Sequence, residues 1–314
     1  MKVISQDEIR RRVSAPLAIA AMREAVIAQS RGECDTPMPM HLDLSAGGGG
    51  EVHIKSSYRR GGRHVALKVA GSYVRRPYGS VVLISVETGE TVAYFDDGGY
   101  LTDLRTAAVA AMVARELGRT DRVLGILGSG VQARLQAQLH AEVLPLEQVV
   151  IWGRNAERAA ACAGDIGRLL PRVRVAVAGS PAEVAARATL IATTTASRAA
   201  LLGAGDVRPG SHVSAVGADS PGKQELDPEL LRRAALVLVD SHAQCVRLGE
   251  LQHAPSEHGR AVEIGAFCAA PVAPVAPVAP VAHDRAGITI ADFTGLGAED
   301  LFIAEACAAD DRAA

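Results

Sequence analysis

The spacing of hydrophobic and polar positions changes along the chain and predicts different elements in different parts. Over residues 5–32 apolar side chains recur every three or four positions among charged ones, which predicts two helices, the second beginning near Pro16. From residue 51 to residue 95 short apolar runs are separated by turn residues, as in strands of a mixed or antiparallel sheet. An alanine-rich stretch over residues 106–117, closed by Gly118, predicts a helix with a C-terminal glycine.

After Asp121 nearly unbroken apolar runs alternate with helical stretches. Unbroken runs are typical of strands buried on both faces, and their alternation with helices predicts a Rossmann-type, doubly wound parallel sheet of the α/β class. A last helix is expected over residues 297–309. The predicted strands lie at residues 123–127, 149–152, 173–177, 190–193, 213–216, 236–239 and 288–291.

These patterns predict two domains in the 314 residues, a length that exceeds what one hydrophobic core usually organises. Residues 1–118, joined by the C-terminal helical segment 297–314, form an α+β domain, and residues 119–296 form the α/β domain. Within the second domain, Pro271–Pro280 carries proline at every third position, which suits polyproline II. We interpret this segment as a stiff surface spacer rather than a ligand of a proline-recognition domain.

Composition and charge favour a small solute as the partner. A formal net charge of −2 gives no general attraction for nucleic acid or for anionic membranes. Five scattered cysteines without CxxC pairing and nine histidines without metal-ligand spacing predict reduced thiols and no metal site. The N-terminus lacks an apolar signal segment and no window suits a membrane span, so we expect a cytoplasmic protein.

A glycine turn, Gly128–Ala133, follows the first strand of the α/β domain and precedes a helix. Gly128 allows the tight turn, and Gly130 lets the backbone approach a pyrophosphate at the helix N-terminus, where free N–H groups and a partial positive charge lie. We therefore expect a dinucleotide cofactor here. The candidate cofactor-binding residues are Gly128, Ser129, Gly130, Val131, Gln132 and, after the strand over 190–193, Thr194.

The end of the next strand indicates which nicotinamide cofactor is bound. Residues 151–155 read Ile-Trp-Gly-Arg-Asn and offer no carboxylate for a ribose 2′-hydroxyl. Arg154 can pair with a 2′-phosphate; the alternative is an exposed loop arginine. The pattern favours NADP over NAD.

Three charged residues are candidates for substrate chemistry. Asp219 follows a predicted strand and so falls at the carboxyl edge of the sheet, where a carboxylate can act as general base, although Asp in such a turn can also be a turn former or a helix cap. Lys68 lies within an apolar strand, and Arg105 lies at the start of a helix, where the dipole disfavours a cation. Both cations suit a substrate carboxylate; the alternative is a salt bridge, for example with Asp103 or Glu51.

Four segments in one order resemble the ornithine cyclodeaminase and mu-crystallin family. They are Leu101–Ala108, Gly128–Ala133, Val216–Leu226 and Ala291–Leu301. The resemblance implies that Lys68 and Arg105 hold the substrate carboxylate and that Asp219 is the acid/base residue beside the substrate amino group. It also implies that Thr294 and Gly295 lie near the nicotinamide, and that the first domain binds substrate and builds a homodimer through its sheet.

The resemblance implies NAD(P)-dependent hydride transfer at the α-carbon of a small amino or imino acid. In the cyclodeaminase reaction NAD⁺ takes a hydride from L-ornithine, the δ-amine attacks the imine, ammonia leaves, and the cyclic imine takes the hydride back to give L-proline. The alternatives are NAD(P)H-dependent reduction of a ketimine or of pyrroline-2-carboxylate, and an alanine-dehydrogenase-like reaction. A protein like mu-crystallin that binds its ligand without turnover is a further alternative.

Two segments depart from the family pattern. Where the family carries an arginine after the first-domain proline stretch, this chain has Met40 or His41. The loop after Lys68, residues 71–79, is shorter than usual and lacks the Gly-Leu-Pro-Thr type segment that lines the substrate pocket. Ornithine specificity therefore does not follow from the resemblance.

Overall fold

A computed structural model of the chain describes residues 1–269 and 286–309. The chain folds into two compact units, the first made of Met1–Val109 and Leu296–Ala314 and the second of Ala110–Gly295. The proline-rich segment Pro271–Pro280, for which the sequence predicts a spacer, lies outside the described residues.

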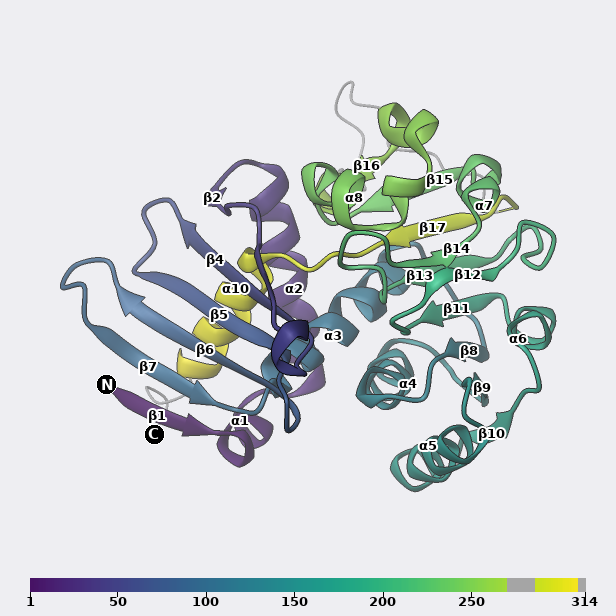
Figure 1. Ribbon diagram of the computed structural model, residues 1–314, viewed down its shortest axis with the longest axis horizontal. Helices are drawn as coiled ribbons and strands as arrows, with labels where there is room; N and C mark the ends of the chain where they lie inside the picture. Colours follow the sequence, from purple (N-terminus) through teal and green to yellow (C-terminus); the bar gives the residue numbers. More distant parts are fainter. Residues whose placement is uncertain (270–285, 310–314) are drawn as a thin grey trace. The chain divides into compact units, whose positions relative to one another are not determined.

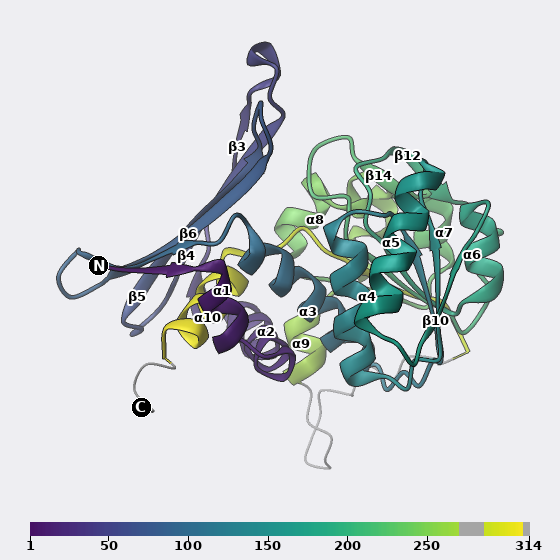
Figure 2. The same ribbon diagram turned by 90° about the horizontal axis from the view of Figure 1, so that it is seen from below.

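The first unit contains a sheet with helices against one face (Figures 1 and 2). Its strand order is β1-β7-β6-β5-β4-β2, with β3 paired to β4. The strands from β4 to β7 are antiparallel neighbours, in agreement with the predicted sheet over residues 51–95, whereas the unpredicted β1 joins β7 in parallel. The strands are β1 Lys2–Ser5, β2 Cys34–Asp35, β3 Met40–Asp43, β4 Glu51–Arg59, β5 His64–Ser72, β6 Pro77–Ser85 and β7 Thr91–Asp96.

The helices of the first unit come from both ends of the chain. Ser5 and Ser14 cap the two predicted N-terminal helices, and Pro16 lies in the first turn of the second, as expected. The predicted last helix packs against α2 and the sheet, so the end of the chain completes the core of the first unit. The elements are α1 Gln6–Arg12, α2 Ala15–Ser30, the short 3₁₀ helix η1 Ser45–Gly47 and α10 Gly297–Ala309.

Helix α3, Tyr100–Glu116, begins six residues before the predicted start. The carboxylate of the buried Asp97 accepts hydrogen bonds from the backbone N–H groups of Gly99 and Leu101, and these bonds anchor the first turn. The prediction that Arg105 lies at the helix start is therefore wrong, because Arg105 lies in the second turn.

The second unit is the predicted doubly wound α/β domain. Its eight-stranded sheet is parallel throughout, in the order β10-β9-β8-β11-β13-β17-β15-β16, and the seven predicted strands lie within one residue of the observed ones. The strands are β8 Val123–Leu127, β9 Gln148–Trp152, β10 Arg174–Val177, β11 Leu190–Thr193, β13 His212–Ala215, β15 Leu236–Val239, β16 Val262–Glu263 and β17 Thr289–Asp292, with a small separate pair β12 Arg198–Leu202 and β14 Gln224–Leu226.

Helices cover the second sheet (Figure 2). Most of them begin at an Asn, Ser or Asp whose side chain accepts a hydrogen bond from the first turn of the helix. Among the described residues no helix combines the length and apolar character of a membrane span. The helices are α4 Val131–Val143, α5 Ala156–Leu169, α6 Pro181–Arg187, α7 Pro228–Arg233, α8 His242–Leu248 and α9 Ile264–Ala269, with 3₁₀ helices η2 Glu250–His253 and η3 Pro255–Arg260.

Four carboxyl groups of the second unit are at most 1% exposed: Glu225, Asp240, Glu250 and Asp292. Each accepts hydrogen bonds from backbone N–H groups of neighbouring loops. In the described part of the chain none of them forms an ion pair with a lysine or an arginine. Burial raises the pKa of Asp292 to about 7, and it also raises the pKa values of Glu225 and Glu250.

Gly297, the first residue of α10, lies where this helix packs closely against β4. A Cβ atom at Gly297 would lie 2.3 Å from the backbone oxygen of Ser56, whereas a Cβ at Gly167 in α5 would meet no heavy atom within 4 Å. We expect Gly297→Ala to lower the free energy of unfolding in urea by about 1–3 kcal/mol, because helix or strand must move. The control Gly167→Ala should be neutral or stabilising by up to about 1 kcal/mol. Equal effects would contradict the close contact.

The raised pKa of Asp292 predicts a stability that falls as pH rises. Its carboxyl group ionises near pH 4 in the unfolded chain but only near pH 7 in the folded protein. Between these values the folded state binds more protons, so the free energy of unfolding should decrease with pH, by at most about 1.4 kcal/mol per pH unit for one proton. Urea titrations between about pH 5 and pH 7 measure the slope. Asp292→Asn should flatten it, and an unchanged slope would exclude this assignment.

Candidate cofactor site and charged clusters

The glycine turn connects β8 to α4. Gly128 has a φ of 128°, and a Cβ atom there would lie 2.3 Å from Oγ1 of Thr194, so the position requires glycine. The backbone N–H of Gly128 donates to the carbonyl of Trp152 at 2.8 Å, which ties the turn to the end of β9. Gly130 is the N-cap of α4 and has no side-chain cap among the described residues. Its backbone has open space around the Cβ direction, so a ligand can approach the helix N-terminus.

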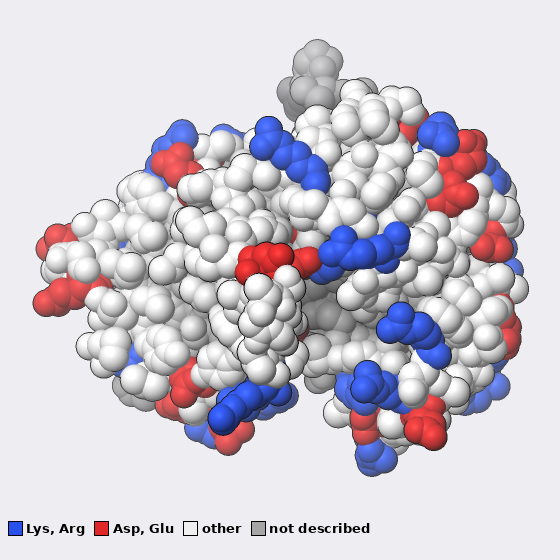
Figure 3. All heavy atoms as spheres, in the orientation of Figure 1, with Lys and Arg blue, Asp and Glu red and all other residues white. Residues whose placement is uncertain are grey.

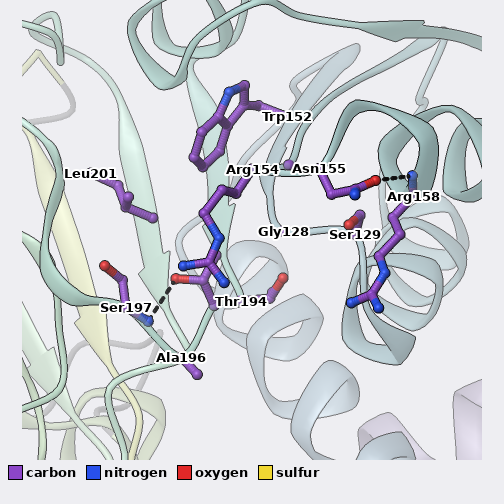
Figure 4. Close-up of a pocket in the computed structure, with 12 residues that line it drawn as sticks. Gly128, Ser129, Trp152, Arg154, Asn155, Arg158, Thr194, Ala196, Ser197 and Leu201 are labelled. Carbon is purple, nitrogen blue, oxygen red and sulfur yellow. Dashed lines mark hydrogen bonds between the residues drawn. The ribbon is translucent and has the colours of Figure 1, made fainter.

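A cavity of about 270 Å³ opens beside this turn (Figure 4). Its walls come from the ends of β8, β9 and β11 and from the first turn of α5. Gly130, Val131 and Gln132 are not among the lining residues, whereas Gly128, Ser129, Arg154 and Thr194 are. The lining residues are Gly128, Ser129, Trp152, Gly153, Arg154, Asn155, Arg158, Thr194, Thr195, Ala196, Ser197 and Leu201.

Two arginines supply the charge of this cavity. Figure 4 shows the side chains of Arg154 and Arg158 extending in the same direction, from the end of β9 and from the first turn of α5. Within residues 1–269 and 286–309 neither guanidinium forms an ion pair, and no lining residue is acidic. The sequence analysis missed Arg158, although its place in the first turn after Asn155, the cap of α5, is a signal that could have found it. The two arginines can bind a phosphate group.

Thr294 and Gly295 lie on the loop between β17 and α10, outside the lining of this cavity. The carboxylate of Asp240 accepts from the backbone N–H groups of Thr294 and Gly295 at 2.7 and 2.6 Å, and from Oγ1 of Thr294 at 3.0 Å. This loop is therefore fixed by a buried carboxylate from the end of β15.

Lys68 and Arg105 belong to a buried ionic cluster in the first unit. Nζ of Lys68 lies 3.6 Å from Oδ2 of Asp300. Nη1 and Nε of Arg105 lie 2.8 and 3.2 Å from the carboxylates of Glu299 and Asp300. A salt bridge is one of the two interpretations that the sequence allows for both cations, but the partners Glu299 and Asp300 could not be predicted because α10 lies far away in the chain.

A second buried lysine, Lys55, lies directly opposite Lys68 in the β4–β5 pair. Residues opposite each other in antiparallel strands share one face, and Lys55 is only 5% exposed. The sequence analysis missed it, although the hairpin turn at Gly61 and Gly62 lies midway between the two lysines. The face of the sheet that carries the ionic cluster therefore holds two buried ammonium groups, Lys55 and Lys68.

The strand pairing places His41 and Met40 on opposite faces of the sheet. His41 pairs with His53, and their ring centroids are 4.3 Å apart. His53 and Lys55 alternate with Ile54 along β4, so His41 lies on the face of Lys55, whereas Met40 lies on the other face.

Asp219 lies on the loop after β13. Its Oδ1 accepts from Nζ of Lys223 at 2.7 Å and from Oγ of Ser220 at 3.2 Å, and the carboxylate is 37% exposed. A half-exposed carboxylate beside an ammonium can exchange protons with a bound ligand. Asp219, like Thr294, is not among the residues that line the cavity.

Other chemistries find little support in the described residues. In that part of the chain no group of His, Cys, Asp and Glu side chains has metal-binding geometry, and the five cysteines are buried free thiols. On the face seen in Figure 3 basic and acidic side chains are interspersed. Such a surface gives no extended basic patch for a polyanion on that face.

Known proteins resemble this chain over its whole length. The model of the ornithine cyclodeaminase/mu-crystallin family matches residues 2–310. An alanine dehydrogenase of Archaeoglobus fulgidus is 30% identical over 314 residues, covering 96% of this chain and 92% of that protein. An L-lysine cyclodeaminase of Streptomyces rapamycinicus is 31% identical over 323 residues, covering 94% and 90%.

The fold is also similar to that of a solved structure. The iminosuccinate reductase of Paracoccus denitrificans in complex with NAD⁺ superimposes with a TM-score of 0.83 at 28% identity, covering 98% of this chain and 95% of that one. Together with the family match across residues 2–310, this similarity confirms the resemblance inferred from the motifs. The chain belongs to the ornithine cyclodeaminase/mu-crystallin family.

Proposed function

We propose that the protein is an NAD(P)-dependent enzyme that transfers a hydride between the cofactor and the α-carbon of a small amino or imino acid. The observation that carries the proposal is the Gly128 turn at the head of α4 beside a cavity whose two arginines form no ion pair within the described residues. Relatives named as an alanine dehydrogenase, an iminosuccinate reductase and an L-lysine cyclodeaminase support it.

The residues of the cavity fit a dinucleotide. Gly128 and Gly130 would let the backbone approach the pyrophosphate, and the N-terminus of α4 would stabilise its charge. Arg154 and Arg158 would pair with a 2′-phosphate, which favours NADP over NAD. When bound, the cofactor supplies the hydride acceptor or donor. Thr294 and Gly295 are assigned to the nicotinamide end by the family resemblance.

The charged groups would bind the substrate and transfer a proton. Lys68 and Arg105, oriented by Asp300, would bind the substrate carboxylate and so hold the α-carbon in one orientation. Asp219 would accept or return a proton at the substrate nitrogen, with Lys223 stabilising its ionised form. These roles combine the family resemblance with the observed ion pairs.

Lys55 bears on the choice among reactions. A diamino acid such as ornithine carries a second ammonium group, which a buried lysine beside the carboxylate-binding cations would repel. We therefore propose reduction of an imino acid, or the reverse oxidation of a monoamino acid, ahead of cyclodeamination. Cyclisation of ornithine and ligand binding without turnover are the competing outcomes.

The first unit is also proposed to form a homodimer through its sheet. The face of the sheet opposite the helices carries apolar side chains, since Val3, Tyr94, Val82 and Leu67 stand side by side across β1, β7, β6 and β5. A row of this kind suits a second copy of the chain. Purified protein is expected to sediment as a dimer.

A turnover assay tests the proposed function. Purified protein receives NADPH or NADH with pyruvate or oxaloacetate plus ammonia and with cyclic imino acids, and NADP⁺ or NAD⁺ with amino acids including ornithine. We expect net cofactor oxidation with an imino acid and no proline from ornithine. Asp219→Asn should lower kcat by about 10²-fold or more with cofactor affinity unchanged. Proline formed with only catalytic cofactor would support the cyclodeaminase instead, and tight cofactor binding without turnover would support the binding protein.

Substitutions of the cavity arginines test the cofactor preference. Arg154→Ala and Arg158→Ala should each raise the KM for NADPH about tenfold or more while the KM for NADH changes little, because only NADPH carries the 2′-phosphate. Arg168→Ala removes an exposed arginine from the far end of α5 and should change neither value. Equal losses with both cofactors would rule out a 2′-phosphate site.

A further inference from the structure

One buried side chain, Glu225 of β14, holds two loops at the carboxyl edge of the second sheet. Its Oε1 accepts hydrogen bonds from the backbone N–H and the hydroxyl of Thr195, at 2.6 and 2.7 Å. Its Oε2 accepts from the backbone N–H of Gly217 at 2.8 Å and from the hydroxyl of Thr193 at 2.6 Å. Every contact is with a donor, which is the environment of an ionised carboxylate.

The two loops are those to which the proposed function assigns separate tasks. Thr195 follows β11 and lines the cavity beside Thr194. Gly217 follows β13 and lies two residues before Asp219. A Cβ atom at Gly217 would lie 2.0 Å from the carbonyl oxygen of Thr195 and 2.6 Å from Oε2 of Glu225, so the loops touch directly and the position requires glycine.

Glu225 is itself fixed by further carboxylates. Glu250 accepts from the backbone N–H groups of Glu225 and Leu226, at 2.7 and 3.2 Å. Asp292 accepts in turn from the backbone N–H groups of Glu250 and Leu251, at 3.0 and 3.1 Å. The result is a chain of carboxyl groups that runs from the last residue of β17 to the wall of the cavity.

The chemistry of these linked carboxyl groups indicates that they do more than fill space in the core. A buried carboxylate without a cationic partner is costly, and an apolar side chain of similar size would fill the same volume at lower cost. A carboxylate, however, offers two oxygens at a fixed separation and can bond two backbone segments at once. Glu225 uses both oxygens in this way, one for each loop.

We infer that Glu225 is a positioning residue that locks the cavity loop at Thr195 to the Asp219 loop, so that the two move as one body. The roles of the two loops rest on the proposed function, whereas the lock itself rests on the contacts of Glu225. Glu225 acts through the loops, and Asp219 remains the proposed acid/base residue.

Glu225→Gln tests the lock in the protein without cofactor. The amide keeps the shape of the side chain but must place its NH₂ group against the backbone N–H of either Thr195 or Gly217. We expect amide hydrogen exchange to quicken about tenfold or more over both 194–198 and 216–220. Glu250→Gln loses an equally buried carboxylate one step further from the cavity and serves as the matched control, since it should quicken exchange at Glu225 and Leu226 more than in these loops.

Cofactor titrations and steady-state kinetics of the same variants separate positioning from a general loss of stability. Glu225→Gln should both weaken dinucleotide binding and lower kcat, each about tenfold or more. Asp219→Asn should lower kcat alone, and Arg154→Ala should raise the KM for NADPH alone. If the wild-type protein binds no dinucleotide, the proposed function fails while the exchange experiment still decides the lock. Unchanged exchange in either loop, or the same exchange pattern in Glu250→Gln, overturns the inference.

Discussion

In the loops that follow the strands of a parallel sheet, backbone N–H groups have no neighbouring strand to which they can donate. Where such groups are buried, they need other hydrogen-bond acceptors. In this protein carboxylates provide many of them. Asp240 accepts hydrogen bonds from the Thr294 loop, Asp292 accepts them from the start of η2, and Glu225 accepts them from the loops after β11 and β13. The geometry of the candidate site therefore depends on buried acids whose partners are peptide groups rather than lysines or arginines.

The two units use buried charge in opposite ways. In the first unit, Lys68 and Arg105 pair with the carboxylates of α10, and Lys55 lies opposite Lys68 on the same face of the sheet. In the second unit, buried anions organise the backbone, and positive charge appears at the exposed arginines of the cavity. Both units thus contain local groups of cations, although the overall net charge of the chain is −2.

The regular elements of the second unit could be predicted because each depends on local pattern. A strand buried on both faces must be apolar throughout, which locates β8, β11 and β15 without knowledge of their neighbours. The short strands β1 and β16 carry no such run, since their place in a sheet is decided by distant partners. The early start of α3 was missed although its signal is local, since Asp97 accepts from backbone N–H groups only two and four residues further along the chain.

In the candidate site too, local features could be predicted from the sequence and long-range contacts could not. The Gly128 turn is a local feature and could be predicted, whereas the partnership of Arg105 with Glu299 joins residues from distant parts of the chain. Glu225 lies inside a segment that the sequence analysis used for the family resemblance, yet its bonds to Thr195 and Gly217 follow from no spacing rule. Local patterns predict the elements and the ligand-facing turns, but the acceptors that hold those turns require the folded structure.

The place of α10 has a consequence for biosynthesis. This helix is synthesised after the second unit, yet it packs against α2 and β4 and carries the counter-ions of Lys68 and Arg105. The core of the first unit and its buried ion pairs can therefore be completed only after the intervening Rossmann unit has been synthesised.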